Sequence, residues 1–210
     1  MKKSEYITIL EKAVLDGNEA EIRDILNKKD ISSAGEKNVI AALSGGIEKA
    51  RLNFRNGVIS IPEFLLCIDA FKAGASLVKK SVRGNRGIPV FIGVVEGDVH
   101  DLGKNIVAAV LSSSGYTVTD MGKNVTREKV RSCITGKKKA VVALSSMMST
   151  SLAPMKDIIT WLGETQPGIR IIVGGASLDH NIAKTLGAHG YADSAVTAPD
   201  ELKRILATLT

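Results

Sequence analysis

From residue 88 onward, short apolar runs alternate with helix-periodic segments, and this alternation constrains the fold more than any other feature of the chain. Strands are expected at 88–95, 117–119, 140–144, 169–173 and 189–192. Helices are expected between and after them, at 103–114, 127–135, 152–164, 178–186 and 199–209. A strand followed each time by a helix is the pattern of a parallel sheet covered by helices on both faces. The sequence therefore predicts a doubly wound, five-stranded α/β domain over residues 89–210.

The first 82 residues contain no convincing strand and have the pattern of helices. Apolar residues recur at helical spacing at 7–15, 19–28 and 36–54, and again in a segment that follows Ser60. Ser60 is expected to cap this last helix, since Pro62 lies in its first turn and Glu63 lies three residues after the cap. Four helices with short connections predict a small antiparallel bundle over residues 1–82. The polar segment 83–88 is the expected linker to the α/β domain.

Composition and charge are those of an ordinary globular protein and exclude several classes of function. Hydrophobic residues make up 44% of the 210 residues, but no apolar run approaches the roughly 20 residues that span a bilayer. The net charge is +6, yet aromatic residues make up only 4%, so no base-stacking platform for nucleic acid is apparent. The start lacks the apolar core of a signal peptide, and Cys67 and Cys133 form no metal-spaced pair. We therefore expect a cytoplasmic protein with reduced thiols and no nucleic-acid or membrane partner.

A polar turn with a potential metal ligand lies between the first strand and the helix that follows it. Asp98 and His100 are two residues apart, so the carboxylate can hold one ring nitrogen and leave the other for a metal. Open α/β sheets bind ligands at the carboxyl ends of strands, where this turn is expected. The simpler alternative is a solvated loop histidine with Asp98 as a helix cap. A phosphate-binding loop is excluded, because the glycine spacing is too long and asparagine follows Lys104.

Two further segments follow strands and should converge on the same edge of the sheet. The run 145–151 is rich in hydroxyl side chains, and Ser149, Thr150 or Ser151 is expected to cap the next helix. Such a cap does not exclude contact with a ligand. Gly174 and Gly175, which follow the fourth strand, are typical of a tight turn.

The pattern Asp-x-His-x-x-Gly at 98–103, with Ser-x-Met at 145–147 and Gly-Gly at 174–175, resembles the cobalamin-binding domain. The run GDVHDLGKNIV, residues 97–107, is most similar to methyl-transferring members related to methionine synthase. This resemblance implies a flavodoxin- or Rossmann-like domain preceded by a helical cap. It also implies that His100 is the lower axial ligand of cobalt, displacing the cofactor's own base, with Asp98 as its hydrogen-bond partner. Ser151 matches the serine that extends this ligand triad.

The resemblance further implies which residues contact the cofactor. Ser145 and the run 174–176 match residues that receive the displaced nucleotide tail. Met147 stands in place of the usual leucine, which conserves volume. Phe54 and Ile61 match apolar residues with which the cap shelters the upper face of cobalt, although both would otherwise be ordinary bundle core. The full set of implied cofactor-binding residues is Gly97, Asp98, Val99, His100, Asp101, Gly103, Ser145, Met147, Ser149, Gly174, Gly175, Ala176, Ala195, Phe54 and Ile61.

From the resemblance we expect a corrinoid protein that shuttles a methyl group between two enzymes. These are a donor-specific methyltransferase and an acceptor methyltransferase of the tetrahydrofolate or thiol type, and a reductive activase is a further expected partner. Such a protein is a carrier subunit rather than a complete enzyme. The alternatives are the small subunit of a cobalamin-dependent mutase, a cobalamin-sensing regulator and a cobalamin storage protein. A mutase subunit would not need the helical bundle, and a regulator would require a DNA-reading domain ahead of it.

Overall fold

The computed structural model describes residues 3–28, 35–81 and 87–209, and the chain divides into two units. Contacts between Cα atoms group residues 1–83 in one unit and residues 84–210 in the other. Most of the expected linker, 83–88, lies outside the described residues. The first unit is helical and the second contains a parallel sheet, so the predicted fold class is confirmed. Within the described ranges, no helix combines the length and the apolar character needed to cross a bilayer.

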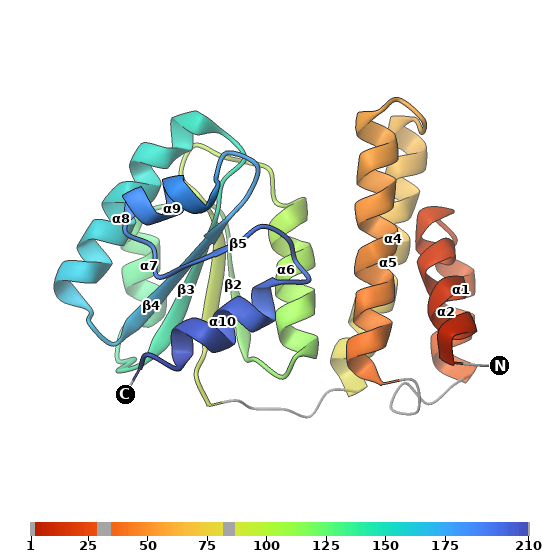
Figure 1. The fold of residues 1–210 in the computed structure, drawn as a ribbon, viewed down its shortest axis with the longest axis horizontal. Coiled ribbons are helices and arrows are strands. Elements are labelled where there is room, and N and C mark those ends of the chain that lie inside the picture. Colours follow the sequence, from red (N-terminus) through yellow and green to blue (C-terminus); the bar gives the residue numbers. More distant parts are fainter. Residues whose placement is uncertain (1–2, 29–34, 82–86, 210) are drawn as a thin grey trace. The chain divides into compact units, whose positions relative to one another are not determined.

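Four helices form the described part of the first unit (Figure 1). They are α1 (Lys3–Leu15), α2 (Glu19–Lys28), α4 (Glu36–Arg55) and α5 (Ile61–Ser81). Glycines allow these helices to approach closely. A Cβ on Gly46 of α4 would lie 2.7 Å from the Cβ of Val14 in α1. A Cβ on Gly74 of α5 would lie 2.7 Å from the side chain of Leu43 in α4, which is part of the buried core.

In the connection between α4 and α5, Glu63 reaches back to Ser60, which is one half of the expected capping box. The Glu63 carboxylate accepts hydrogen bonds from the Ser60 hydroxyl and from the Ser60 backbone N–H, each at 2.7 Å. These bonds hold the pKa of Glu63 below its usual value. At the end of α4, Gly57 takes a left-handed conformation with φ 70°, as expected of a glycine that follows a helix.

The sheet of the second unit has five parallel strands in the part of the chain that the structure describes. They are β1 (Val90–Val95), β2 (Val118–Val125), β3 (Ala140–Ser145), β4 (Ile169–Gly174) and β5 (Gly190–Ala192). Their order is β2-β1-β3-β4-β5. The chain leaves β1 toward one edge of the sheet and leaves β3 toward the other. The carboxyl ends of β1 and β3 therefore flank the topological switch point, where open α/β sheets bind ligands.

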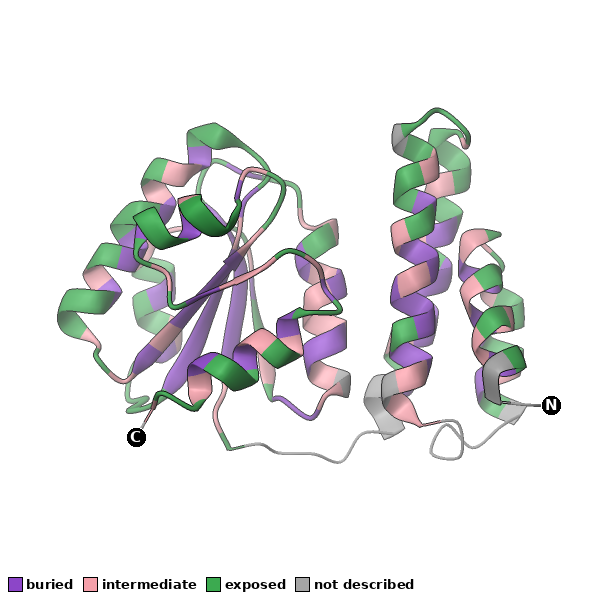
Figure 2. Ribbon diagram, viewed as in Figure 1, coloured by how far each residue is buried: buried purple, intermediate pink, exposed green. Residues whose placement is uncertain are grey.

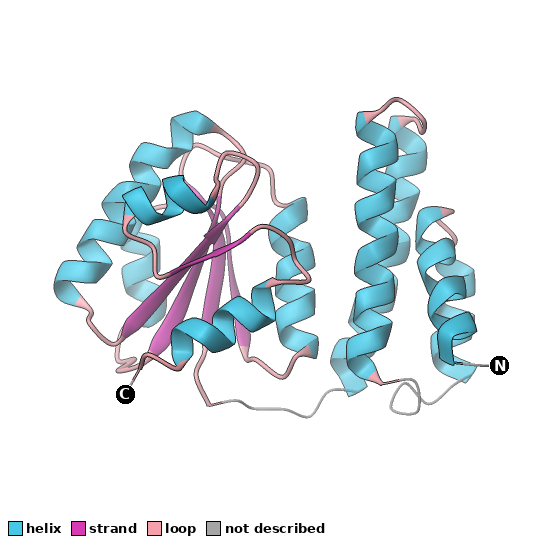
Figure 3. Ribbon diagram, viewed as in Figure 1, coloured by secondary structure: helices cyan, strands magenta, loops and turns pink. Residues whose placement is uncertain are grey.

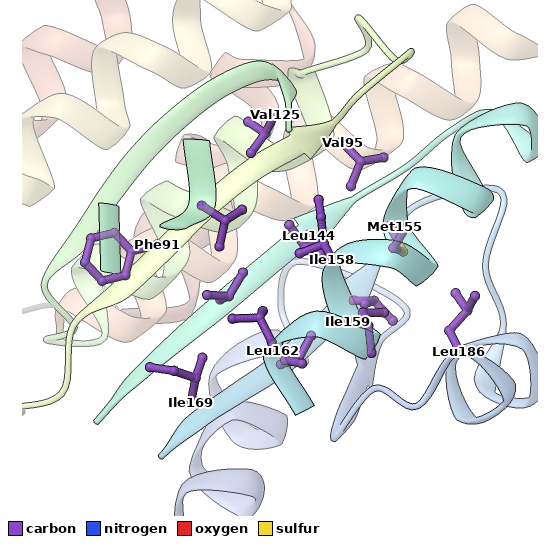
Figure 4. Packing of buried hydrophobic residues seen from close by; sticks show 14 of the residues in the cluster. Phe91, Val95, Val125, Leu144, Met155, Ile158, Ile159, Leu162, Ile169 and Leu186 are labelled. Carbon is purple, nitrogen blue, oxygen red and sulfur yellow. The ribbon is translucent and has the colours of Figure 1, made fainter. Parts of the chain in front are cut away.

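Helices cover both faces of this sheet (Figures 1 and 3). One face carries α6 (Leu102–Ser113) and α10 (Ala198–Leu206), and the other carries α7 (Arg127–Ile134), α8 (Leu152–Thr165) and α9 (His180–Leu186). Figure 2 shows that the central strands are mostly buried, and β1 is buried along its whole length. In the core shown in Figure 4, Leu144 of β3 belongs to the same buried cluster as Ile158 and Leu162 of α8. Burial on both faces explains why these strands appear as continuous apolar runs.

Strand β2 differs most from its prediction. It extends over 118–125, whereas a strand was predicted at 117–119, so the predicted end was wrong. The pairing of β1 with β2 shifts register twice, because β2 contains more residues than the stretch of β1 that it faces. Gly122 and Asn124 take left-handed conformations there, with φ 85° and 53°. A polar run with glycine is typical of a turn, but here it forms bulges within a strand. The other strands and helices of this unit begin and end within three residues of their predictions.

Candidate functional site

The loop between β1 and α6 holds Asp98 and His100 in one hydrogen-bonded unit. The buried Asp98 carboxylate contacts Nδ1 of the His100 ring at 2.8 Å and accepts a hydrogen bond from the His100 backbone N–H at 2.9 Å. Its other oxygen accepts a hydrogen bond from the backbone N–H of Met147, in the loop after β3. The structure therefore joins the loops that follow β1 and β3 across the switch point, through a single carboxylate.

The charge of Asp98 determines which nitrogen of His100 is available to a ligand. Burial raises the pKa of the Asp98 carboxyl, but hydrogen bonds from the backbone N–H groups of His100 and Met147 and from the His100 ring outweigh it. The pKa of Asp98 is therefore held below its usual value. An ionised carboxylate only accepts hydrogen bonds, so Nδ1 carries the proton that His100 donates. In the neutral ring, Nε2 keeps its lone pair and can bind a metal. The His100 side chain is 50% exposed, so a ligand can reach it.

The rest of this loop is open. The N-cap position of α6 is Asp101, so the alternative that Asp98 caps this helix is wrong. A Cβ on Gly97 or Gly103 would meet no atom within 4 Å, and the side chain of Val99 is exposed. All of these predicted contact residues thus lie in or beside one accessible loop that carries His100.

The serines after β3 form a separate buried cluster whose centre the sequence did not predict. Ser146 is fully buried, and its Oγ lies 2.7 Å from Oγ of Ser151 and accepts a hydrogen bond from the Ser177 hydroxyl at 2.9 Å. Ser151 also donates to the backbone oxygen of Met148 at 2.7 Å. Ser151 occupies the N-cap position of α8, as predicted, but its hydroxyl makes no capping bond. Its described hydrogen bonds do not join Asp98 or His100, so the structure does not bring the predicted triad together.

The Gly174-Gly175 pair packs tightly against neighbouring backbone. Gly174 pairs in register with Ser145, the last residue of β3. A Cβ on Gly174 would lie 2.8 Å from the backbone oxygen of Ala192. A Cβ on Gly175, where φ is 118°, would lie 2.0 Å from the backbone oxygen of Ser146. Backbone packing alone therefore accounts for both glycines, as a tight turn requires, and passage of a nucleotide tail beside them stays a prediction.

Three further predicted contact residues differ in exposure. Ser149 and Ala176 are exposed, in the loops after β3 and β4. Ala195 is buried in the loop between β5 and α10. The order of the strands places these loops next to one another along the carboxyl edge of the sheet, with the β5 loop farthest from the switch point.

The donor set fits a metal held by a macrocycle better than a bare ion. Among the described residues, no three His, Cys, Asp or Glu side chains gather where they could hold a metal. A metal in a macrocycle, as in haem proteins, requires only an axial ligand from the protein. His100 can supply that ligand. Exposed apolar side chains of Val99, Met147 and Met148 belong to the two loops joined by Asp98, and such side chains suit the face of a large ring.

A second candidate surface lies on the helical unit and is apolar. Phe54 and Ile61 are exposed, so the alternative that both are bundle core is wrong. The Phe54 ring stacks on Phe64, with ring centroids 4.9 Å apart. Other exposed apolar residues, which the sequence did not single out, come from the same end of α4 and α5. We refer to the whole set as the apolar tip: Leu52, Phe54, Val58, Ile61, Leu65 and Leu66.

Comparison with known proteins identifies the family. The B12-binding domain family matches residues 88–202. Dimethylamine corrinoid protein 1 of Methanosarcina acetivorans is 30% identical over 99% of this chain and 100% of its own length. The Methanosarcina barkeri monomethylamine corrinoid protein shares the fold, with a TM-score of 0.74 at 23% identity over 97% of this chain and 100% of that one. A chain in the methanol:cobalamin methyltransferase complex MtaBC of Methanosarcina barkeri is 28% identical, with a TM-score of 0.57, and the match covers 100% of this chain and 82% of that one. This chain therefore belongs to the corrinoid-protein family, with a cobalamin-binding domain that follows a helical unit.

Proposed function

We propose that this chain is a methyl carrier that binds cobalamin with the cofactor's own base displaced and His100 as the lower axial ligand. The observation that carries the proposal is the Asp98–His100 pair, in which a buried carboxylate holds Nδ1 and leaves Nε2 of a half-exposed ring. A carboxylate at Nδ1 orients the imidazole and makes its other nitrogen a better donor to a metal. When bound, the corrinoid supplies the cobalt on which the methyl group travels.

Ser151 takes an indirect part in this proposal. Its hydroxyl contacts Ser146 and the backbone oxygen of Met148. The neighbouring residue, Met147, donates its N–H to Asp98. Ser151 therefore supports the shape of a loop that in turn holds the carboxylate, and a direct bond between Ser151 and Asp98 stays a prediction.

We assign the displaced nucleotide tail to the loops that follow β3, β4 and β5. The residues proposed to contact it are Ser145, Ser149, the run 174–176 and Ala195. Their support is the strand order, which makes these loops neighbours, and the small size of every side chain involved. Small side chains let a ligand approach the main chain and its hydrogen-bonding groups.

The apolar tip of the helical unit is the proposed shelter for the methyl-bearing face of the cofactor. Exposed apolar patches of this kind mark surfaces that bind a ligand or a partner. Phe54 and Ile61, the two residues matched by resemblance, both belong to it and are exposed. An apolar cover would exclude water from a reactive group during transfer.

The proposed partners are a donor-specific methyltransferase, an acceptor methyltransferase of the tetrahydrofolate or thiol type, and a reductive activase. One relative is named for dimethylamine, and another comes from a complex with a methanol:cobalamin methyltransferase. Relatives named for different donors share this architecture, which supports placing donor choice in the partner enzyme. A carrier is favoured over a mutase small subunit because this chain has a helical unit with an exposed apolar tip.

Electron paramagnetic resonance of the Co(II) corrinoid bound to the full chain tests the ligation. We expect splitting from one axial nitrogen that changes when histidine is labelled with nitrogen-15. His100→Gln should abolish the histidine-dependent splitting, whereas His180→Gln, at an exposed histidine of α9, should leave it unchanged. Splitting in the parent that is insensitive to the label, or label-sensitive splitting that persists in His100→Gln, would eliminate His100 as the ligand.

A further inference from the structure

The bulged end of β2 lies against the loop that carries Asp98 and His100. Two register shifts between β1 and β2 add residues to β2 at its carboxyl end. Bulges re-aim side chains and are common beside functional sites. Here the bulged segment reaches the loop after β1 at several points. The backbone N–H of Glu96 donates to the oxygen of Val125 at 3.1 Å, and the Lys123 ammonium lies 3.9 Å from the Asp101 carboxylate.

Asn124 contacts Gly97, the residue that directly precedes Asp98. Its side-chain oxygen accepts a hydrogen bond from the backbone N–H of Gly97, at 2.9 Å. Asn124 has φ 53° and is the one described non-glycine residue with a positive φ. Asparagine tolerates a positive φ better than most residues do. Such a φ is nevertheless uncommon outside glycine, so its presence here calls for an explanation. The hydrogen bond to Gly97, in a neighbouring loop, provides one.

Gly97 is a point where the loop needs an external contact. It has φ 83°, and a Cβ there would meet no atom within 4 Å, so side-chain packing does not hold it. The next residue is Asp98. On its other side, Asp98 is bound by the backbone N–H of Met147. Asn124 and Met147 thus hold the segment 97–98 from β2 and from the loop after β3.

We propose that Asn124 is a positioning residue, which fixes Gly97 so that Asp98 presents His100 in one orientation. This inference rests on the proposed ligation by His100. The other ion pairs between β2 and this region lie beyond His100: Lys123 with Asp101, and Lys104 of α6 with Asp120. Neither pair contacts Gly97, so neither can replace the Asn124 hydrogen bond. Loss of the Asn124 side chain should therefore loosen the segment that carries the carboxylate while leaving the sheet and α6 in place.

Three variants separate this role from a general effect on folding. Asn124→Gly removes the side-chain oxygen that accepts the Gly97 hydrogen bond, and glycine tolerates the left-handed backbone. Asn124→Asp keeps an acceptor oxygen and also tolerates that conformation. Thr126→Ala is the matched control, because it removes the capping bond from the Lys129 N–H in the same region and leaves Gly97 untouched.

The first readout is amide hydrogen exchange in the full chain without corrinoid, with Ile172 of β4 as an internal reference. We expect exchange at Gly97 to accelerate about tenfold relative to Ile172 in Asn124→Gly, since one hydrogen bond is lost. Asn124→Asp and Thr126→Ala should stay close to the parent. Unchanged exchange in Asn124→Gly, or equal acceleration in Thr126→Ala, would overturn the proposal.

The second readout is the axial nitrogen signal of the bound Co(II) corrinoid. In Asn124→Gly the histidine-ligated fraction should fall at least twofold, and Asn124→Asp should restore it. A full histidine signal in Asn124→Gly would overturn the positioning role and leave the proposed function intact. Absence of the signal in the parent would overturn the ligation by His100, and the positioning role with it.

Discussion

The carboxyl edge of the sheet and the apolar tip of the helical unit are built in opposite ways. At the edge, the polar side chains of Asp98, Ser146 and Ser151 are buried and hydrogen-bonded. At the tip, apolar side chains such as Val58 and Ile61 are exposed. Hydrogen bonds are directional and specify distances and angles, whereas apolar contact is not directional. The edge can therefore hold a ligand in one geometry, while the tip can cover a surface and release it without losing any specific bond.

The largest expected effect of a single substitution is at the edge, at Gly175. A Cβ there would lie 2.0 Å from the backbone oxygen of Ser146, and the φ of 118° disfavours any other residue. We expect Gly175→Ala to lower the free energy of unfolding of the α/β unit by about 3 kcal/mol. Trp161, the single tryptophan of the chain, lies in α8 and provides the fluorescence signal for urea unfolding.

Gly103→Ala is the control, since it lies in α6 where a Cβ would meet nothing within 4 Å. Alanine should be neutral or slightly stabilising there, because glycine weakens a helix. If both variants lost equal stability, the edge would be no more tightly packed than an open helix surface.

Asp98→Asn should have the next largest effect, because the carboxylate accepts three hydrogen bonds in a buried position. An amide cannot accept all of them, and we expect a loss of about 2 kcal/mol in the free energy of unfolding at pH 7. The folded pKa of Asp98 lies below its unfolded value of about 3.9. Its contribution is therefore complete above that value and is lost as pH falls through the folded pKa.

Urea unfolding of parent and Asp98→Asn between pH 7 and pH 3 provides the measurement. The difference in free energy of unfolding between the two proteins should narrow below about pH 4. Asp157→Asn, at an exposed aspartate with an ion pair to Arg127, should change stability by less than about 0.5 kcal/mol at every pH. If the difference in free energy of unfolding between the parent and Asp98→Asn stayed constant across this pH range, the charge of Asp98 would add no stability beyond that of its hydrogen bonds.

Substitutions in the apolar tip should change the free energy of unfolding little, but they should clearly change the photolysis of methylcobalamin. Changing Phe54 and Ile61 together to Ala removes exposed apolar surface and the ring stack on Phe64, for a loss of about 1 kcal/mol at most. Photolysis of added methylcobalamin should be faster in this double variant, while corrinoid binding is largely kept. Ile61→Leu keeps the apolar surface and should behave like the parent. Equal photolysis rates in all three proteins would remove the tip from the proposed shelter.

Local chemistry was predictable from the sequence, and long-range geometry was not. The Asp98–His100 contact spans two residues, so the turn alone brings the groups together, and the prediction of their pairing is confirmed. The centre of the serine cluster could not be predicted, because five of the seven residues at 145–151 carry hydroxyls. Which of them points inward depends on the end of β3 and on Ser177, 31 residues away from Ser146.

Exposure and bulges were the other features that the sequence did not reveal. Ile61 and Leu65 of the tip are four residues apart in α5, and such spacing alone cannot separate a buried stripe from an exposed binding surface. The run 120–124 has the composition of a turn, and only pairing with β1 turns it into a bulged strand. Both features depend on what lies opposite the segment in space.

Met147 makes its contact with Asp98 in a way that does not depend on which side chain it carries. Its side chain is exposed, and it reaches Asp98 through the main-chain N–H. Every amino acid except proline has that group. Methionine, leucine and many other residues can therefore succeed one another here during evolutionary drift with the contact intact. A sequence search that requires leucine at this position would miss chains that hold the carboxylate equally well. Wide variation of the residue at 147 among related sequences would also conceal one of the hydrogen bonds that define the site.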